Sequence, residues 1–221
     1  MQRGYLLHSS AYRENSQLVR LLVDNLGRVD AVVRVGSGKR SLKSVLQPFQ
    51  PLLFELSGHS DLRNMQQVES ASPAVPLSGD ALYAGMYLNE LLMRTLSVHQ
   101  SGENLFLPYH RTLLQLAHEF AEPTLRYFEV TLMQDLGCMP SLNHDASGEL
   151  IATDTQYRYL IESGFIRGEG RYSGAMLARL ATESLRDDDL VGAKHLTRTL
   201  LAPLLGEKPL VSRQLFAGRK R

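Results

Sequence analysis

The sequence predicts an α+β chain in which a small all-β head precedes a helical body. Five short apolar, partly β-branched segments occur within the first 70 residues, separated by turn-forming residues. A stretch rich in Ser, Pro and Ala follows at 70–79 and indicates a linker. Beyond it, the spacing of apolar residues changes from about two to about 3.6, the helical period.

The head is predicted from its strands and turns. Between the second and third strands, Asp24, Asn25 and Gly27 suit a tight turn. Short strands at this density indicate a small barrel or sandwich rather than a parallel α/β unit. The predicted strands are 4–8, 16–23, 28–35, 51–56 and 62–69.

The body is predicted to be all-α. Thr153 and Gln156 form the pattern of a capping box, which predicts a helix running through Ile161. Apolar stripes at helical spacing predict the other helices, which cover 88–96, 106–120, 123–136, 176–180 and 196–201. The expected domain boundaries are therefore 1–75 for the head and 76–221 for the body.

Length and composition exclude several classes of protein. The chain has 221 residues, enough for one or two domains with a real core. Its apolar runs are only a few residues long, whereas a membrane helix needs about 20. No secretion signal is recognised at the N-terminus. Cys138 is the only cysteine, which excludes an intramolecular disulfide and a Cys-based zinc site. We expect a soluble, cytoplasmic protein.

The formal net charge of +1 conceals an uneven distribution. Residues 1–70 carry +3, residues 71–207 carry −7, and residues 208–221 carry +5. Two basic segments around an acidic centre hint at an anionic partner, although chain termini often carry solvated charge as well.

The segment 35–44 combines two glycines with three cations. It superficially resembles a phosphate loop, but the Walker A pattern requires a glycine five residues before Gly38, where Val33 stands. The pattern also requires Ser or Thr after Lys39, where Arg40 stands. A nucleotide-hydrolysing loop is therefore rejected.

Five cations and one acid, Asp30, occur within the sixteen residues 28–43. Beside a barrel, such a basic segment suits contacts to backbone phosphates without base reading. A solvated loop in which these charges do nothing is the alternative, and the residues alone leave both open. The cations are Arg28, Arg34, Lys39, Arg40 and Lys43.

No catalytic or metal constellation is found. The histidines show no His-x-x-x-His pair, the serines no G-x-S-x-G, and Cys138 no catalytic surroundings. Asp187–Asp189 is interpreted as a solvated cap of the next helix rather than as a metal site. The C-terminal stretch is basic, but apolar residues within 210–216 indicate that part of it packs.

Several motifs occur in a fixed order over essentially the whole chain. They are Gly4–Leu7, Tyr12-x-Glu14-x-Ser16, Gly36–Ser44, Leu46–Phe49, Ala84–Leu92, Arg126–Gly137 and Lys208–Arg213. Together they resemble the bacterial RecO family of recombination mediators.

This resemblance implies an N-terminal five-stranded OB fold at 1–75 that binds DNA, and a partner-binding helical domain at 76–221. Family members bind single- and double-stranded DNA and anneal complementary strands. With the partner RecR they help load RecA onto DNA coated by single-strand-binding protein (SSB), and they bind the acidic, apolar C-terminal tail of SSB. A nucleoid-associated place in the cytoplasm and a non-enzymatic role are expected.

One departure from the family concerns zinc. Many relatives carry a four-cysteine zinc site after a Gly-x-x-Pro step, here Gly137 to Pro140. His144 and Ser147 stand where the first cysteine pair would be, and no second pair exists. The chain therefore resembles the zinc-free branch, for which we expect no metal and no cofactor. Any role that the zinc module has elsewhere is in doubt here.

The resemblance also assigns roles to residues. The five cations of 28–43 would contact DNA, with Tyr5 and Tyr12 as stacking candidates and Phe49 more a core residue than a platform. The SSB tail needs an apolar pocket rimmed by cations, for which the candidates are Arg94, Arg111 and Arg126. Each of these also fits an ordinary surface arginine. The alternative to a DNA mediator is a protein-binding adaptor that uses the barrel and the helical scaffold.

Overall fold

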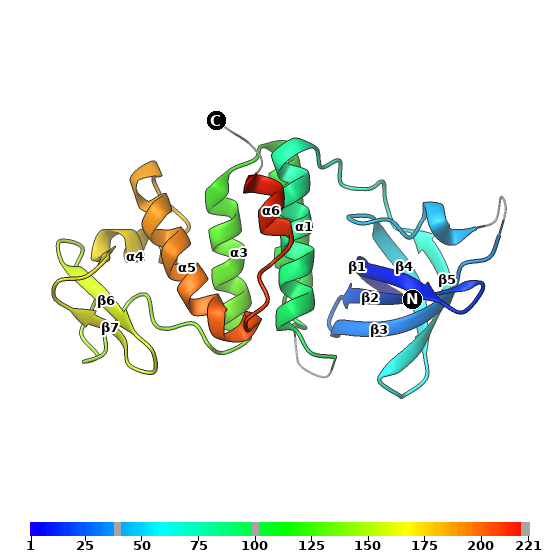
Figure 1. The fold of residues 1–221 in the computed structure, drawn as a ribbon, viewed down its shortest axis with the longest axis horizontal. Coiled ribbons are helices and arrows are strands. Elements are labelled where there is room, and N and C mark those ends of the chain that lie inside the picture. The colour runs from blue at the N-terminus through cyan, green and yellow to red at the C-terminus, as the bar shows by residue number, and fades with distance from the viewer. Residues whose placement is uncertain (38–40, 99–101, 218–221) are drawn as a thin grey trace. The chain divides into compact units, whose positions relative to one another are not determined.

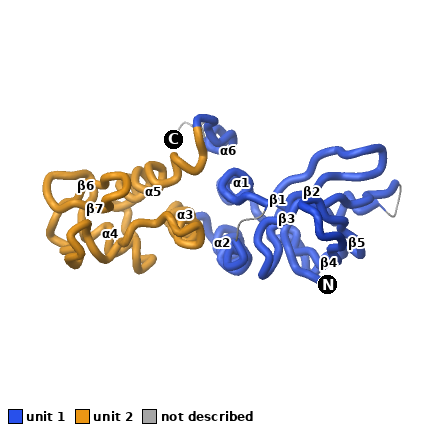
Figure 2. The backbone as a smooth tube through the Cα atoms, turned by 90° about the horizontal axis from the view of Figure 1, so that it is seen from below, with its two compact units in different colours: residues 1–120, 207–221 blue, residues 121–206 orange. Residues whose placement is uncertain are grey.

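A computed structural model describes residues 1–37, 41–98 and 102–217. The chain divides into two compact units (Figure 2). Unit 1 comprises residues 1–120 and the returning C-terminal segment from Glu207, and unit 2 comprises residues 121–206. Among the described residues, no helix is long and apolar enough to cross a membrane.

The first half of unit 1 is a closed five-stranded barrel (Figure 1). The strand order is β1-β2-β3-β5-β4, in which β3 and β5 run parallel and the other neighbours antiparallel. A five-stranded Greek-key barrel with this strand order has the topology of the OB fold. Its strands are β1 (Gln2–Tyr12), β2 (Ser16–Val23), β3 (Gly27–Arg34), β4 (Pro51–Ser57) and β5 (Leu62–Ser70).

The barrel strands form where the period-two pattern predicts them. On β2 and β3 every second side chain enters the core, including Val19, Leu21 and Val33. The predicted turn is confirmed by Asn25 and Gly27, whose φ angles are +58° and +70°. All five predicted strands are confirmed, with ends that shift by a few residues at most.

Two long helices and the C-terminal segment complete unit 1. They are α1 (Gly79–Thr95), α2 (Phe106–His118) and α6 (Ser212–Ala217). The Glu90 carboxylate on α1 accepts hydrogen bonds from the backbone N–H groups of Val211 and Ser212, both at 2.8 Å. Leu210 is 1% exposed and Phe216 packs edge-on against Tyr83. The prediction that part of the C-terminal stretch packs is confirmed.

Unit 2 contains three helices, which are α3 (Glu122–Asp135), α4 (Gly174–Ala181) and α5 (Leu190–Leu205), and a short 3-10 turn, η3 (Asp187–Asp189). Asp189 accepts two hydrogen bonds of 2.6 Å from the Arg179 guanidinium and one from the Arg186 backbone N–H. The predicted position of this acidic run at the start of a helix is confirmed, because α5 begins directly after Asp189, but the prediction that it is solvated is wrong for Asp189, which is 5% exposed.

The all-α prediction for the body is wrong over 153–173. Instead of a helix, the chain forms a three-stranded sheet of β6 (Gln156–Leu160), β7 (Gly164–Arg167) and β8 (Tyr172–Ser173). Tyr157 is fully buried between exposed neighbours, which is the period of a strand. Its hydroxyl accepts a hydrogen bond of 2.9 Å from the Ala152 N–H, so the predicted helix start is instead a strand entry. The fold class of a barrel followed by helices is otherwise confirmed.

Candidate nucleic-acid interface

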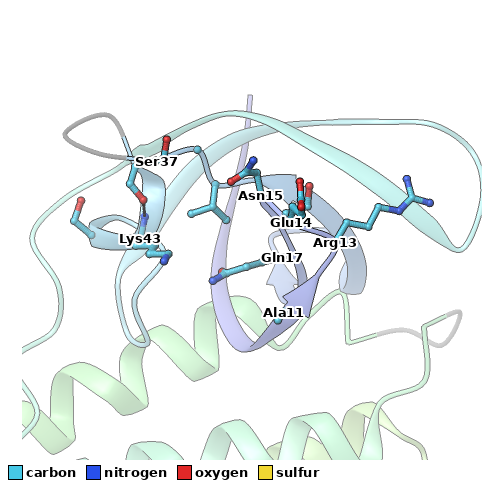
Figure 3. Close-up of a pocket in the computed structure, with 12 residues that line it drawn as sticks. Ala11, Arg13, Glu14, Asn15, Gln17, Ser37 and Lys43 are labelled. Carbon is cyan, nitrogen blue, oxygen red and sulfur yellow. Dashed lines mark hydrogen bonds between the residues drawn. The ribbon is translucent and has the colours of Figure 1, made fainter.

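A polar cleft opens between the β1–β2 turn and the segment that follows β3. Its volume is about 600 Å³. Figure 3 shows Arg13, Glu14 and Asn15 of the turn on one side and Ser37 and Lys43 on the other. The described lining is Ala11, Arg13, Glu14, Asn15, Ser16, Gln17, Val35, Gly36, Ser37, Ser41, Lys43 and Ser44.

Local sequence explains the shape of both walls. On one side, Arg13 adopts a φ of +53° in the tight β1–β2 turn. Beyond β3, Gly36 has a φ of +71°, a backbone conformation that glycine adopts without strain. The short 3-10 helix η2 (Leu42–Ser44) is then capped by Ser41, whose hydroxyl accepts a hydrogen bond of 3.3 Å from the Lys43 N–H. The cap fixes the backbone that carries Lys43 beside the cleft.

The cleft is positive and open to solvent. Arg13 and Lys43 are exposed, and Glu14 is the one acid among the described lining residues. Arg34 ends β3 directly across from Ser16 and is exposed as well. Within the described part of the chain, neither Arg34 nor Lys43 makes an ion pair, so both guanidinium and ammonium groups are available to an anion. Predicted residues Lys39 and Arg40 lie outside the described residues.

Arg28 has a different task. Its guanidinium donates to the carbonyl oxygens of Met93 at 3.0 Å and Leu96 at 2.6 Å, where α1 ends. It also pairs with Asp30 at 3.2 Å. A cation on the last carbonyls of a helix satisfies acceptors that have no partner within the helix. Arg28 therefore joins the barrel to α1. Its contact with DNA stays a prediction, and such a contact would require the guanidinium to give up some of these hydrogen bonds.

The aromatic candidates separate according to burial. Tyr5 is fully buried, and its hydroxyl lies 2.6 Å from His110 Nδ1 on α2, so the expectation that it stacks on bases is wrong. Burial raises the pKa of Tyr5 to about 12. Phe49 is 5% exposed, as expected of a core residue. Tyr12 is half-buried on the outer strand face, with the Arg13 guanidinium 5.1 Å from its ring centre.

Comparison with known proteins covers both parts of the chain. Residues 1–74 match the family model described as "Recombination protein O N terminal", and residues 76–214 match "Recombination protein O C terminal". The chain belongs to the recombination protein O family.

Curated relatives of the family, named DNA repair protein RecO, match almost their full length. The protein from Pseudoalteromonas atlantica is 46% identical over 96% of this chain and 92% of its own. That from Pseudomonas putida is 45% identical over 100% and 97%, and that from Pasteurella multocida is 43% identical over 97% and 93%. Membership in the RecO family carries a role in DNA repair.

The three arginines that the family resemblance assigned to the SSB tail lie in different surroundings. On α2, Arg111 is exposed. Half-buried Arg94 donates to the Lys208 carbonyl oxygen at 2.9 Å, which helps to hold the C-terminal segment on α1. Arg126 belongs to unit 2 and is 4% exposed, with Glu129 at 2.8 Å. Its burial argues against a direct partner contact, because the guanidinium does not reach the surface.

The region of the family's zinc site holds no cluster of metal-ligating side chains. Across residues 1–37, 41–98 and 102–217, no group of three or more His, Cys, Asp or Glu residues is placed to hold a metal ion. Cys138 is exposed, and partial desolvation of its thiol raises the pKa of that group above its ordinary value.

Sequence reasoning missed His8, Arg13 and Arg20, which lie on or beside the same face. Strand alternation signals Arg20, which stands between the core residues Val19 and Leu21, but not His8, because an irregularity between Leu6 and His8 shifts the alternation of β1. In the barrel register His8 pairs with Arg20, and Arg20 pairs with Asp30. The outward positions of three adjacent strands thus form one polar surface.

Proposed function

We propose that this chain binds single- and double-stranded DNA with the polar cleft and the adjoining outer face of β1, β2 and β3. The observation that carries the proposal is the coincidence of an OB barrel with exposed Lys43 and Arg13 in the lining of one cleft and exposed Arg34 opposite Ser16 of that lining. OB barrels bind nucleic acid on this strand face and with the β1–β2 loop. Tyr12 supplies an aromatic surface of the kind on which bases stack.

We further propose that the bound strands are annealed, without enzymatic chemistry. Cations that neutralise the phosphates of two strands lower their mutual repulsion and raise their local concentration. Annealing therefore needs a charged surface and no reacting group, which fits a sequence without a recognisable catalytic motif.

The proposed pathway role follows from the family. Together with RecR, the chain helps to load RecA onto SSB-coated single-stranded DNA, acting in the cytoplasm at the nucleoid. The SSB tail is assigned to α2, where Leu107 and Leu114 are 49% and 48% exposed on the helical face that carries Arg111. These residues are spaced by four and three positions, so they are neighbours on one face. An apolar face with a cation suits an acidic tail with an aromatic end.

Binding of a fluorescent oligo-dT at two salt concentrations tests the DNA proposal. Each phosphate contact to a single strand contributes a slope of about −0.7 to the logarithmic salt dependence. Removal of two contacts in Arg34→Ala/Lys43→Ala should flatten the slope by about 1.4, so wild type should lose roughly sevenfold more affinity than the variant across a fourfold rise in salt. The charge reversal Lys39→Glu/Arg40→Glu should weaken binding further.

Arg198→Ala is the matched control, because Arg198 is an exposed cation on α5 of unit 2. It should leave both affinity and slope unchanged. If wild type does not bind the oligonucleotide, or if Arg34→Ala/Lys43→Ala keeps the wild-type slope, the proposed interface is wrong. Binding of partner proteins with none to bare DNA would instead support the adaptor alternative.

A further inference from the structure

A second hollow of about 420 Å³ continues the cleft along β1. Gln17 and Lys43 line both spaces, so one extended molecule can pass from one to the other. Residues Leu6–Ser9 of β1 form one wall, and Leu46–Pro48, with Lys43, form the other. We call this space the side hollow. Of the predicted DNA contacts that the structure describes, only Lys43 borders it.

His8 in the side hollow is held by a neighbour on β2. The Arg20 Nη1 lies 3.1 Å from His8 Nδ1. A guanidinium only donates hydrogen bonds, so Nδ1 accepts and the neutral imidazole carries its proton on Nε2. The contact therefore selects one tautomer of His8 and leaves the Nε2 proton to face another group.

Arg20 is itself only weakly neutralised. Its Nε lies 3.5 Å from Asp30, but the same carboxylate lies 3.2 Å from Arg28 Nε. One acid thus serves two arginines, and Nε of Arg20 is buried without a hydrogen bond in the described structure. Arg20, Arg28 and Asp30 together retain a net positive charge next to His8 even when His8 is neutral.

We propose that the side hollow is a subsite for one phosphate of the bound nucleic-acid strand, with Lys43 and His8 in its lining and Arg20, which contacts His8, as the neighbouring cation. The proposal rests on the proposed DNA-binding function and extends it to residues on β1 and β2. Lys43 is shared with the main cleft, so a strand that follows the cleft brings its next phosphates to this hollow.

Phosphate binding at this subsite is coupled to a proton. Partial burial and the Arg20 charge hold the pKa of His8 below its ordinary value of 6.5, so His8 is neutral in the free protein at pH 7. The charged group in contact with it is Arg20 from β2, which is paired with Asp30 on β3, and Lys43 from η2 lines the same hollow. The negative charge of a bound phosphate offsets the repulsion between these cations and the imidazolium, so it favours the protonated form of His8.

Protonation also changes the hydrogen bonds. Once Nδ1 carries a proton it no longer accepts from Arg20, so the guanidinium is released and both side chains donate to the anion. The pKa of His8 is then higher in the complex than in the free protein. The gain in affinity is fully present below the free-state pKa and is lost as the pH rises through the value in the complex.

The test is the affinity for fluorescent oligo-dT at constant ionic strength between about pH 5.5 and pH 8. One linked proton changes affinity by at most about tenfold per pH unit. We expect wild type to gain roughly three- to tenfold more affinity on acidification than His8→Gln. His118→Gln is the matched control, since His118 is an exposed histidine at the end of α2 in the same unit, and it should keep the wild-type profile.

A second readout is the imidazole titration of His8 by NMR, which should move to higher pH when oligo-dT is added. If wild type binds with normal salt dependence but shares its pH profile with His8→Gln, the subsite is wrong and the DNA-binding proposal stands. A His8 titration that does not move on addition of oligo-dT would exclude the subsite in the same way. If wild type does not bind oligo-dT at any pH, both proposals fail. Equal thermal midpoints of wild type and His8→Gln exclude misfolding.

Discussion

Replacement of Arg126 by Met should destabilise unit 2 strongly. The Arg126 and Glu129 side chains are 5% and 1% exposed and lie 2.8 Å apart on successive turns of α3. Removal of one member of a buried ion pair leaves the other charge buried without it, at a cost of about 3–5 kcal/mol. In a chain of this length, each kcal/mol lowers the midpoint of thermal unfolding by about 2–4 °C. Arg126→Met should therefore lower it by roughly 6–20 °C.

The double variant Arg126→Met/Glu129→Leu separates the charge from the packing. A buried ion pair replaced by apolar residues of similar volume is often neutral or stabilising, so most of the lost stability should return. Thermal unfolding of wild type, both single variants and the double variant, followed by calorimetry and circular dichroism, completes a double-mutant cycle that gives the coupling free energy of the pair. The structural role of Arg126 is refuted if Arg126→Met unfolds at the wild-type temperature yet no longer binds an SSB-tail peptide, because Arg126 would then be a contact residue.

Three further perturbations test other parts of the structure. Partial burial alone would raise the pKa of Glu90, but hydrogen bonds from the C-terminal segment outweigh it and hold the pKa below 4.5. Glu90→Gln should thus expose α6 to proteolysis at neutral pH. The difference from wild type should shrink as the pH falls below 4.5, because the wild-type carboxylate is then protonated. If α6 of the variant resists proteolysis as well as that of wild type, Glu90 does not hold the C-terminal segment on α1. Tyr5→Phe removes the hydrogen bond with His110 and should reduce stability by about 1 kcal/mol in chemical denaturation, with unchanged affinity for oligo-dT. Arg28→Leu should speed hydrogen exchange at the C-terminal end of α1, and unaltered exchange there would exclude the capping role.

The barrel could be predicted from the sequence because its signals are local. Strand β3 shows clear alternation of buried and less buried residues, β2 shows it in part, and turn residues such as Asn25 and Gly27 separate the two strands. Helices α1, α2 and α3 were accessible for the same reason, since their buried residues repeat at helical spacing. Pro123 also sits in the first turn of α3, as expected of a proline near a helix start.

The features that sequence reasoning missed depend on residues far apart in the chain. Thr153 and Gln156 satisfy a capping-box pattern, yet β6 forms because Tyr157 pairs with Arg167 and Tyr172 in neighbouring strands. No local pattern reveals these pairings, and tertiary contacts override a short helix signal.

The candidate site was predictable in part. The basic character of the segment after β3 is visible in the sequence, and Arg34 and Lys43 are exposed there. The structural role of Arg28 could not be predicted from the sequence, because the carbonyl groups that it contacts lie 65 and 68 residues away along the chain. The contact between His8 and Arg20 likewise depends on the register of β1 and β2.

Hydrogen exchange with and without a saturating oligo-dT tests the central claim most directly, because it locates the bound strand on the chain. We predict slower exchange in the β1–β2 turn at 13–17 and in the segment after β3 that includes Ser41–Ser44, together with the neighbouring β1 residues of the side hollow. The peptides of unit 2 should exchange at unchanged rates. Protection confined to unit 2, with none at the cleft, would contradict the assignment of the barrel as the DNA-binding surface.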